Sequence, residues 1–373
     1  MKKSKLFFSF FAMILCLGLF SLKVSAFEAT GTVSEPIQPV SIVTGDEDPT
    51  TFPSYDLKVP VATKSLVVPI NMDYKGQLKI NLLGREVSKG MNIYLYSDEA
   101  CTSQIGNSKY LSSYSLEDDM KLDIPKKATY YLKFELLSYA EADATVSITP
   151  YSLNSEDRTL KNNTWVFSHP FSYGSQISNK ITVNTSGYIA VEGIDTSDYS
   201  SFGVTLCNSK KAKLSEETYI NSSKDYTTYF AVKKGTYYIK TKSSNDYKLR
   251  YKFTAVKDTG NPSKSKATSI GKGKTAKGLV LSEDSVSKAD WYKVKLTSKR
   301  KLSFEIYGKS CDLICFEIIP ASKNVILIGS TVRIYDAGGG VYSTQDSMPA
   351  GTYYIKVTKT RKTCSGNYSI KFK

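Results

Sequence analysis

The chain has little of what metal sites and hydrolytic sites are usually built from. Its 373 residues contain a single histidine, His169, and no Gly-x-Ser-x-Gly motif. One imidazole excludes sites that need several histidine ligands and leaves only one candidate base for a serine-type triad. Because His169 directly precedes Pro170 in a stretch typical of a loop, we predict that it has no catalytic role and that the protein is not an enzyme.

Arginine is also scarce, although the chain is basic. The formal net charge is +15, yet the arginines are only Arg85, Arg158, Arg250, Arg300, Arg333 and Arg361. Nucleic-acid-binding proteins favour the planar guanidinium group, so we do not expect a nucleic acid as partner. The lysines are spread along the chain, which is typical of a solvated surface. The alternative is attraction to an anionic surface or polymer, such as a cell-wall polymer.

Long apolar runs are absent except for one, at residues 6–22. Lys2, Lys3 and Lys5 precede it, and Val24-Ser25-Ala26 places small residues where a signal peptidase cuts. We therefore predict a secretory signal peptide over residues 1–26, with an uncleaved N-terminal anchor as the alternative. The mature chain is expected to have no transmembrane segment and to be secreted, either released or held non-covalently at the cell surface.

The cysteines do not form an obvious disulfide framework. After the leader there are five, Cys101, Cys207, Cys311, Cys315 and Cys364. On one straight strand Cys311 and Cys315 would lie about 13 Å apart, beyond the roughly 7 Å limit for bridged Cα atoms, whereas either could pair with Cys364. We favour the interpretation that most of the five are small buried apolar residues.

Sustained helical periodicity is absent beyond the leader. Residues 27–53 are rich in Thr, Ser, Pro and Glu and have no period, so we predict a flexible N-terminal segment. From there on, apolar and polar residues alternate in short runs that Gly, Asn, Asp and Ser interrupt. This pattern is typical of half-buried strands and predicts an all-β protein.

One strand pattern occurs three times. The letters ATYYLK at 128–133 return as GTYYIK at 235–240 and again at 351–356. The interval of roughly 110 residues is too long for a solenoid repeat and fits an array of whole domains. Alternating strands must stack as two sheets to bury a core. We therefore predict three tandem antiparallel β-sandwich domains, jelly-roll-like, over residues 54–151, 152–257 and 258–373.

Further strands are matched between the three copies. Each tyrosine strand is followed by a final alternating run, at 144–148, 247–253 and 368–372, and we expect these last two strands to form a hairpin. Two upstream sets of equivalent strands are predicted, the first at 76–82, 187–192 and 301–306, the second at 92–96, 202–206 and 331–335.

The period of two assigns faces to the repeated strand. It turns Tyr130, Tyr237 and Tyr353 inward and Tyr131, Tyr238 and Tyr354 outward. Outward tyrosines at one register position can stack on sugar rings or protein surfaces, so they are our candidate ligand-binding residues. Packing at strand edges and the high β-propensity of tyrosine are the alternative explanation.

The third copy resembles the bacterial pre-peptidase C-terminal domain over roughly residues 258–373. The resemblance rests on DTGN at 258–261, DWY at 290–292, AGTYYIKV at 350–357 and GNYSI at 366–370. The first two copies share mainly the tyrosine strand and the final strand, and look like degenerate copies. The resemblance implies a jelly-roll-like sandwich on a secreted bacterial protein, often an accessory to peptidases, with relatives that bind collagen or polysaccharide.

The same resemblance implies a calcium ion near the N-terminal edge of the third domain. Asp258, Asn261 and Asp290 match acidic positions of that motif and offer the oxygen ligands that Ca²⁺ prefers. The alternative is that Asp258 and Asn261 cap a turn and that Asp290 is solvated. We predict no other cofactor.

Together these features predict a secreted, non-catalytic bacterial protein, expected to be a monomer, that works in adhesion or ligand binding. Three weak sites on one chain would bind a polysaccharide, an anionic wall polymer or a matrix protein multivalently. Two other classes remain open at this point. One is a structural spacer or scaffold without a ligand of its own, and the other is an unrecognised hydrolase.

Overall fold

The computed structural model describes residues 35–87, 89–112, 114, 117–172, 174–195, 201–221, 227–327 and 329–373. The predicted signal peptide lies outside the described residues. Within them, no helix has the length and apolar character needed to cross a membrane. The described helices are two short 3-10 turns, η1 (Pro49–Thr51) and η2 (Lys264–Lys266), and the rest of the regular structure is β-strand.

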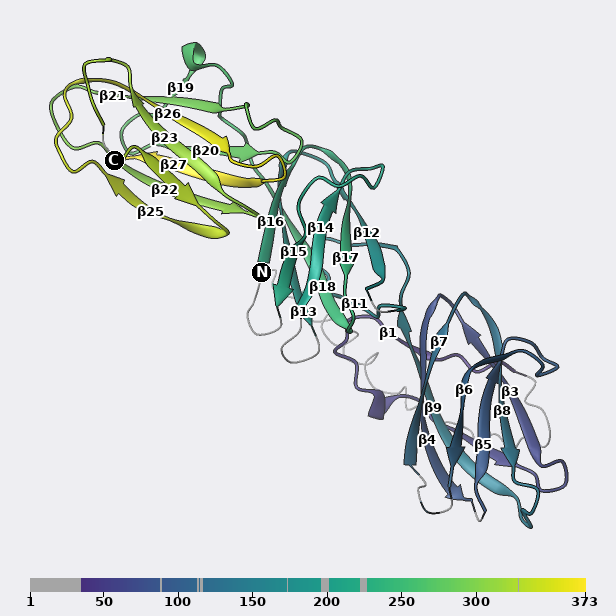
Figure 1. Cartoon of the computed structure of the whole chain (residues 1–373). Coiled ribbons are helices and arrows are strands. Elements are labelled where there is room, and N and C mark those ends of the chain that lie inside the picture. Colours follow the sequence, from purple (N-terminus) through teal and green to yellow (C-terminus); the bar gives the residue numbers. More distant parts are fainter. Residues whose placement is uncertain are drawn as a thin grey trace, which may run out of the picture.

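The strands form three tandem β-sandwiches that follow one another in chain order along an elongated array (Figure 1). The fold class is therefore as predicted. In the first sandwich one sheet has the order β3 (Ser65–Met72), β8 (Ala128–Leu136), β5 (Met91–Tyr96) and β6 (Gln104–Leu111). The other has the order β1 (Val40–Ile42), β9 (Ala144–Asn154), β4 (Gly76–Glu86) and β7 (Glu117–Ile124), with β2 (Tyr55–Val59) also on β9.

The second sandwich repeats this arrangement. Its first sheet has the order β10 (Arg158–Thr159), β12 (Gln176–Val183), β17 (Gly235–Lys242), β14 (Ser201–Cys207) and β15 (Thr218–Asn221). Its second sheet has the order β11 (Val166–Ser168), β18 (Tyr247–Ala255), β13 (Gly187–Asp195) and β16 (Thr227–Val232).

The third sandwich follows the same plan. Its first sheet has the order β19 (Thr268–Ser269), β21 (Asp290–Leu296), β26 (Gly351–Lys359), β23 (Ile314–Pro320) and β24 (Thr331–Ile334). Its second sheet has the order β20 (Thr275–Val280), β27 (Gly366–Phe372), β22 (Ser303–Ser310) and β25 (Ala337–Ser343). Each sandwich encloses its own apolar core between the two sheets.

The repeated tyrosine strand lies in the interior of a sheet in every copy, as β8, β17 and β26. The last strand of each copy, β9, β18 or β27, belongs to the opposite sheet. The predicted hairpin is therefore wrong. Both edges of the tyrosine strand are already bonded to other strands, so the chain crosses the core before its final strand.

One of the two predicted sets of equivalent strands also needs correction. The first set, β4, β13 and β22, pairs with the final strand in all three copies and is confirmed. In the second set, β5 and β14 pair with the tyrosine strands of the first two copies. In the third copy the strand that pairs with the tyrosine strand is β23, not residues 331–335. Residues 331–334 form β24, one strand further out. Alternation marks both strands equally and cannot separate them.

The inward tyrosines are confirmed. Tyr130, Tyr237 and Tyr353 are 1%, 4% and 2% exposed. The hydroxyl of each donates to the carbonyl four residues earlier, at 2.9 Å to Lys126, 3.2 Å to Lys233 and 2.8 Å to Pro349. The ring fills the core while the hydroxyl fixes the turn before the strand, which satisfies a polar group that would otherwise be buried alone.

We expect Tyr353→Phe to lower the free energy of unfolding of the third sandwich by ~1 kcal/mol, because it removes this bond and keeps the ring. Tyr354→Phe, one residue further on the outward face, is the matched control and is expected to change stability by less than half as much. Urea unfolding of the full chain, followed by tryptophan fluorescence, measures both. Equal losses for the two variants would contradict the assignment of faces.

The N-terminal segment predicted to be flexible is built into the array over its described part, residues 35–53, which corrects that prediction. The Ile37 amide donates to Pro69 at 2.8 Å and forms a parallel bridge with Ile70. Leu160 and Ile270 make the same amide contact at the start of the other two sandwiches, to Lys180 and Lys293. Single buried isoleucines in a polar, aperiodic stretch carry no period, so the pattern could not reveal this anchor.

Residues 40–51 then extend toward the second sandwich before the chain returns to β2 (Figure 1). Strand β1 runs parallel to the end of β9, and the Val43 carbonyl accepts a bond of 2.7 Å from the Phe167 amide of the second sandwich. Ile42, Leu153 and Phe167 form a small apolar cluster there. The segment thus ties the first sandwich to the second.

The second and third sandwiches meet at Ala231 of β16. The Ser365 hydroxyl accepts a bond of 2.7 Å from the Ala231 amide and donates one of 3.1 Å to its carbonyl. Ala231 packs with Leu279 and Leu281 in a second apolar cluster. Backbone hydrogen bonds and apolar packing thus coincide at this contact between the two sandwiches.

Candidate functional site

The candidate ligand-binding tyrosines occupy equivalent positions on the outer face of one sheet in each sandwich. Tyr131 lies between Pro69 of β3 and Tyr96 of β5, and Tyr238 between Lys180 of β12 and Cys207 of β14. All three outward tyrosines are half-buried, so each presents part of its ring to solvent. The structure does not bring them together; it distributes them along the array.

Tyr354 has the most developed surroundings of the three. Its ring lies edge-on to Trp291 of β21, with the ring centroids 6.3 Å apart. The Lys264 amino group is 4.9 Å from the Tyr354 centroid and 5.6 Å from that of Trp291, while Lys356 is 5.9 Å from the latter. The sequence pattern did not point to Trp291 and Lys264 as site residues, although Trp291 also stands at an outward position of its strand.

The other two copies carry simpler versions of this surface. In the second sandwich the Lys211 amino group lies 5.2 Å from the Tyr238 ring centroid. In the first, Tyr94 and Tyr96 of the neighbouring strand β5 have centroids 6.1 Å apart. An aromatic face with an ammonium group beside it can stack on the C–H face of a sugar while the lysine bonds a hydroxyl or an acidic group.

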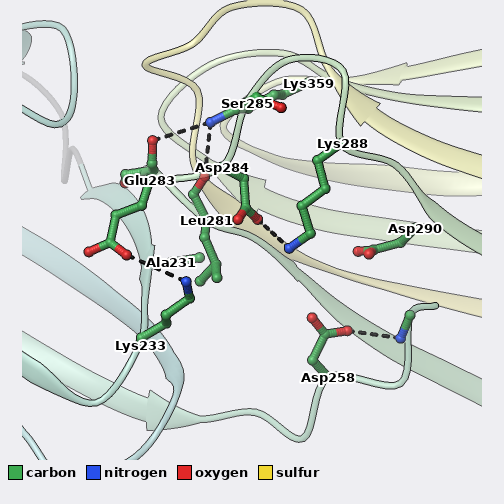
Figure 2. A network of polar contacts seen from close by, with 12 residues as sticks. Ala231, Lys233, Asp258, Leu281, Glu283, Asp284, Ser285, Lys288, Asp290 and Lys359 are labelled. Carbon is green, nitrogen blue, oxygen red and sulfur yellow. Dashed lines mark hydrogen bonds and ion pairs between the residues drawn. The ribbon is translucent and has the colours of Figure 1, made fainter. Parts of the chain in front are cut away.

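Two of the predicted calcium residues, Asp258 and Asp290, lie in a polar network at the N-terminal edge of the third sandwich (Figure 2). Asp290 is 7% exposed, and its carboxylate accepts a bond of 2.7 Å from the Tyr368 hydroxyl. Burial is the main cause that raises the pKa of Asp290 to about 6, and the negative charge of Asp258 adds to it. Burial also raises the pKa of Asp258.

The arrangement of this network does not fit a calcium ion without rearrangement. The Asn261 side-chain oxygen accepts a bond from the Ser263 amide, and an Asp258 oxygen accepts one from Gly260. The Lys288 amino group, 2.7 Å from Asp284, points into the space between the carboxylates (Figure 2). Among the described residues no cluster of three histidine, cysteine or acidic side chains suits a metal. Calcium binding by Asp258, Asn261 and Asp290 stays a prediction.

Another lysine near this network is buried. Lys359, at the end of β26, is 4% exposed. Its amino group donates to the carbonyls of Leu281 at 2.9 Å and Ser282 at 3.3 Å, and to those of Lys362 at 2.7 Å and Cys364 at 3.3 Å. Burial lowers its pKa. The ammonium thus joins the loop after β20 to the loop before β27, and both loops reach the second sandwich.

His169 lies at the junction of the first two sandwiches. Its Nδ1 is 2.5 Å from Asp246, and its Nε2 is 3.9 Å from Asp123 of the first sandwich. Lys79, also of the first sandwich, is 3.8 Å from Asp246. The described contacts of the histidine therefore belong to a polar network that joins two domains.

The described cysteines are all free thiols. Cys207 and Cys364 are buried, and Cys101, Cys311 and Cys315 are partly buried. Burial raises the pKa of Cys311 to about 12 and that of Cys364 further. A raised pKa disfavours the thiolate, which is the reactive form.

Fold and surfaces together define a tandem array of three β-sandwich domains with repeated aromatic outer faces. No family model matches the chain, and no curated protein matches it. Among solved structures, the chain is similar to the pre-peptidase C-terminal domain of a collagenase from Bacillus anthracis. The identity is 17%, with 29% of this chain and 95% of that domain covered and a TM-score of 0.22. This is the domain class that the sequence of residues 258–373 resembles.

Two further solved structures also match. The tandem CBM51 modules of a family 98 glycoside hydrolase from Streptococcus pneumoniae are 9% identical, with 51% of this chain and 81% of that one covered and a TM-score of 0.20. Tripeptidyl peptidase 2 is 11% identical with a TM-score of 0.22. The match covers 91% of this chain and 32% of tripeptidyl peptidase 2, so this chain spans about a third of the length of that protein. These identities are too low to transfer a function.

Proposed function

We propose that the chain is a secreted, non-catalytic protein that binds an extracellular polysaccharide through its repeated aromatic faces. The observation that carries the proposal is the recurrence of Tyr131, Tyr238 and Tyr354 at one register position on three sheets, each partly exposed. Two of them have a lysine amino group within about 5 Å of the ring centroid, at 5.2 Å and 4.9 Å. Three weak sugar sites on one chain bind a long polymer jointly.

The junctions support joint binding. Each junction combines backbone hydrogen bonds with an apolar cluster, and these contacts restrict how far the three faces can move apart. A second site on a rigid chain binds at a high effective concentration once the first is engaged, which can raise the overall affinity by roughly 10²–10⁴-fold. The net charge of +15 adds long-range attraction when the polymer is anionic.

The test is retention of the purified chain on immobilised cell-wall polysaccharide. We expect Tyr131→Ala, Tyr238→Ala or Tyr354→Ala alone to weaken binding a few-fold and the triple variant to weaken it about 100-fold, because joint binding is lost. The matched control replaces Tyr139, Tyr219 and Tyr335 by alanine. These are 60%, 58% and 60% exposed, one in each sandwich, and stand at other positions.

Two results would count against the proposal. If the control triple variant lost as much binding as the first, the repeated register position would have no special role. If one isolated sandwich bound as tightly as the chain, joint binding would be excluded. The contacts at the junctions also favour a second function, a spacer without a ligand, and that function predicts no retention on any polymer at low salt.

A further inference from the structure

A pocket of about 460 Å³ lies on the outer face of the third sandwich, away from all three candidate tyrosines. It lies over strands β22, β25 and β27, and Tyr307, Lys309, Ala337, Gly339, Asn367 and Ser369 are among the residues that line it. These strands belong to the sheet that β16 of the second sandwich contacts. The pocket therefore lies beside the junction of two domains.

The floor of the pocket is flat because β25 carries almost no side chains there. Gly339 stands opposite Tyr307, and Ala337 stands opposite Lys309. A Cβ at Gly339 would lie 2.7 Å from the Tyr307 ring and 2.2 Å from the Ile306 carbonyl, and its φ of +143° disfavours other residues. The glycine thus leaves room for the Tyr307 ring beside the strand. Tyr307 is 50% exposed, so part of its side chain is open to solvent beside the pocket.

Lys309 supplies a cation at the edge of the pocket nearest the second sandwich. Its amino group lies 5.7 Å from the ring centroid of Tyr188 and 5.4 Å from that of Tyr229, both in the second sandwich. The two rings are themselves 6.2 Å apart. Lys309 is exposed, and among the described residues it has no carboxylate partner. The rings hold the ammonium in place and leave its charge available.

The side of the pocket formed by β27 is polar. Asn367 stands opposite Lys309 on β27, and Ser369 stands opposite Tyr307. Within the described part of the chain, the Asn367 side-chain oxygen is buried without a hydrogen-bond partner. A buried amide oxygen without a donor costs free energy, and a small reorientation toward the pocket would let the amide bond a ligand hydroxyl.

We propose that this pocket binds a carboxylated pyranose, one acidic sugar of an anionic polysaccharide. The sugar ring stacks on Tyr307 over the flat floor, its carboxylate pairs with Lys309, and its hydroxyls bond Asn367 and Ser369. An aromatic face next to a fixed cation suits a ring that carries its own negative charge, whereas a polyol phosphate has no ring to stack. The inference rests on the proposed function and names a ligand class for a separate site.

The sharpest test places a carboxylate inside the pocket. Ala337 is exposed on the edge strand β25 and directly opposite Lys309, so Ala337→Glu brings a carboxylate within reach of its amino group without disturbing the core. We expect this variant to bind polygalacturonate at least tenfold more weakly than the wild-type chain. Ala337→Gln is matched in size and uncharged, and is expected to stay within about twofold.

Removal of the two main contacts gives an independent reading. Lys309→Gln and Tyr307→Ala are each expected to weaken polygalacturonate binding about tenfold. For Lys309→Gln, the salt dependence of binding should fall as well. Binding of a neutral glucan should be unchanged in both variants. A glycerol-phosphate polymer should bind no more tightly than the glucan by this site, and if Lys309→Gln weakened its binding as strongly, the choice of an acidic sugar would be wrong.

The outcomes separate this inference from the proposed function. If the chain binds polygalacturonate and all four variants bind like the wild type, the pocket inference is overturned while polysaccharide binding stands. If loss of binding follows only the triple variant of Tyr131, Tyr238 and Tyr354, the same conclusion holds. If the wild-type chain binds no polysaccharide, both proposals fail together.

Discussion

Lys359→Met is expected to lower the free energy of unfolding of the third sandwich by about 3 kcal/mol. Methionine matches lysine closely in length and fills the same space, so the loss comes from the four carbonyls that the ammonium now satisfies. A buried acceptor without a donor destabilises the folded state by about 1–3 kcal/mol. The variant also removes a buried charge, whose desolvation is unfavourable, and this offsets part of the loss.

The effect should also reach the junction with the second sandwich. Leu281 packs against Ala231 there, and Ser365 bonds to the backbone of Ala231. Lys359 bonds the Leu281 carbonyl and the Cys364 carbonyl, one residue before Ser365. Loss of the ammonium frees both loops, so we expect faster amide hydrogen exchange at Ala231 as well as within the third sandwich.

The measurement uses the two tryptophans. Trp165 lies in the second sandwich and Trp291 in the third, so in a Trp165→Phe background fluorescence reports the unfolding of the third sandwich by urea. Lys356→Met, on the outward face of the same strand, is the matched control. Its lysine is 3.7 Å from Glu317 at a partly exposed site, and such a pair is worth less than about 1 kcal/mol. Equal losses in both variants would show that the four hydrogen bonds from Lys359 to carbonyls do not add to the free energy of unfolding.

The sequence already contained the signal for this lysine. Tyr353, Ile355 and Val357 alternate inward, and Lys359 is the next residue of that same face. A charged residue at an inward position has two explanations: the strand has already left the core there, or the charged side chain is buried. The sequence does not distinguish between them. The choice depends on carbonyls from loops at 281–282 and 362–364, which only the folded chain brings together.

The repeated tyrosine strand was predictable because it carries three coincident signals, the paired rings, the period of two and the recurrence along the chain. Its outward members are placed as predicted, and so are the strands of the first matched set. The extension at residues 40–51 was not predictable, because its contacts are with backbone groups of β9 and with Phe167, far along the sequence.

The pocket at Lys309 could not be predicted either, because its surroundings come from two different domains. Tyr188 and Tyr229 belong to one domain, and Tyr307 and Lys309 to the next. Each stands at an outward position of an ordinary alternating strand, as do many other residues of this chain. Their combination depends on how two sandwiches pack at Ala231, and composition and period contain no information on that packing.

Asp290→Asn is expected to stabilise the third sandwich at neutral pH. The folded pKa of Asp290 is about 6, against the ordinary aspartate pKa of 3.8, so the folded state binds this proton more tightly than the unfolded state. The stability that the carboxyl contributes is fully present below pH 3.8 and is lost as the pH rises through about 6. At pH 7.5 the ionised form costs about 3 kcal/mol of stability, and asparagine avoids that cost.

The groups that face Asp290 support this sign. Asp258 and Asp284 disfavour its charge, whereas Lys288 and the Tyr368 hydroxyl favour it. The asparagine side-chain oxygen can still accept the bond from Tyr368, so the variant keeps that contact. Urea unfolding in the Trp165→Phe background should show a gain of up to about 3 kcal/mol at pH 7.5 and almost none at pH 4. A gain that does not depend on pH would contradict the assignment.

The matched control has the opposite sign. Asp284 lies 2.7 Å from the Lys288 amino group, with its side chain 13% exposed, so Asp284→Asn removes a partner and should destabilise the sandwich. Calcium gives the decisive comparison. If Asp258, Asn261 and Asp290 bind Ca²⁺, millimolar calcium must raise the free energy of unfolding of the wild-type chain. It must raise that of Asp290→Asn by less. If the Lys288 ammonium is the only cation of this network, calcium changes neither protein, and Asp290→Asn stays the more stable one at pH 7.5.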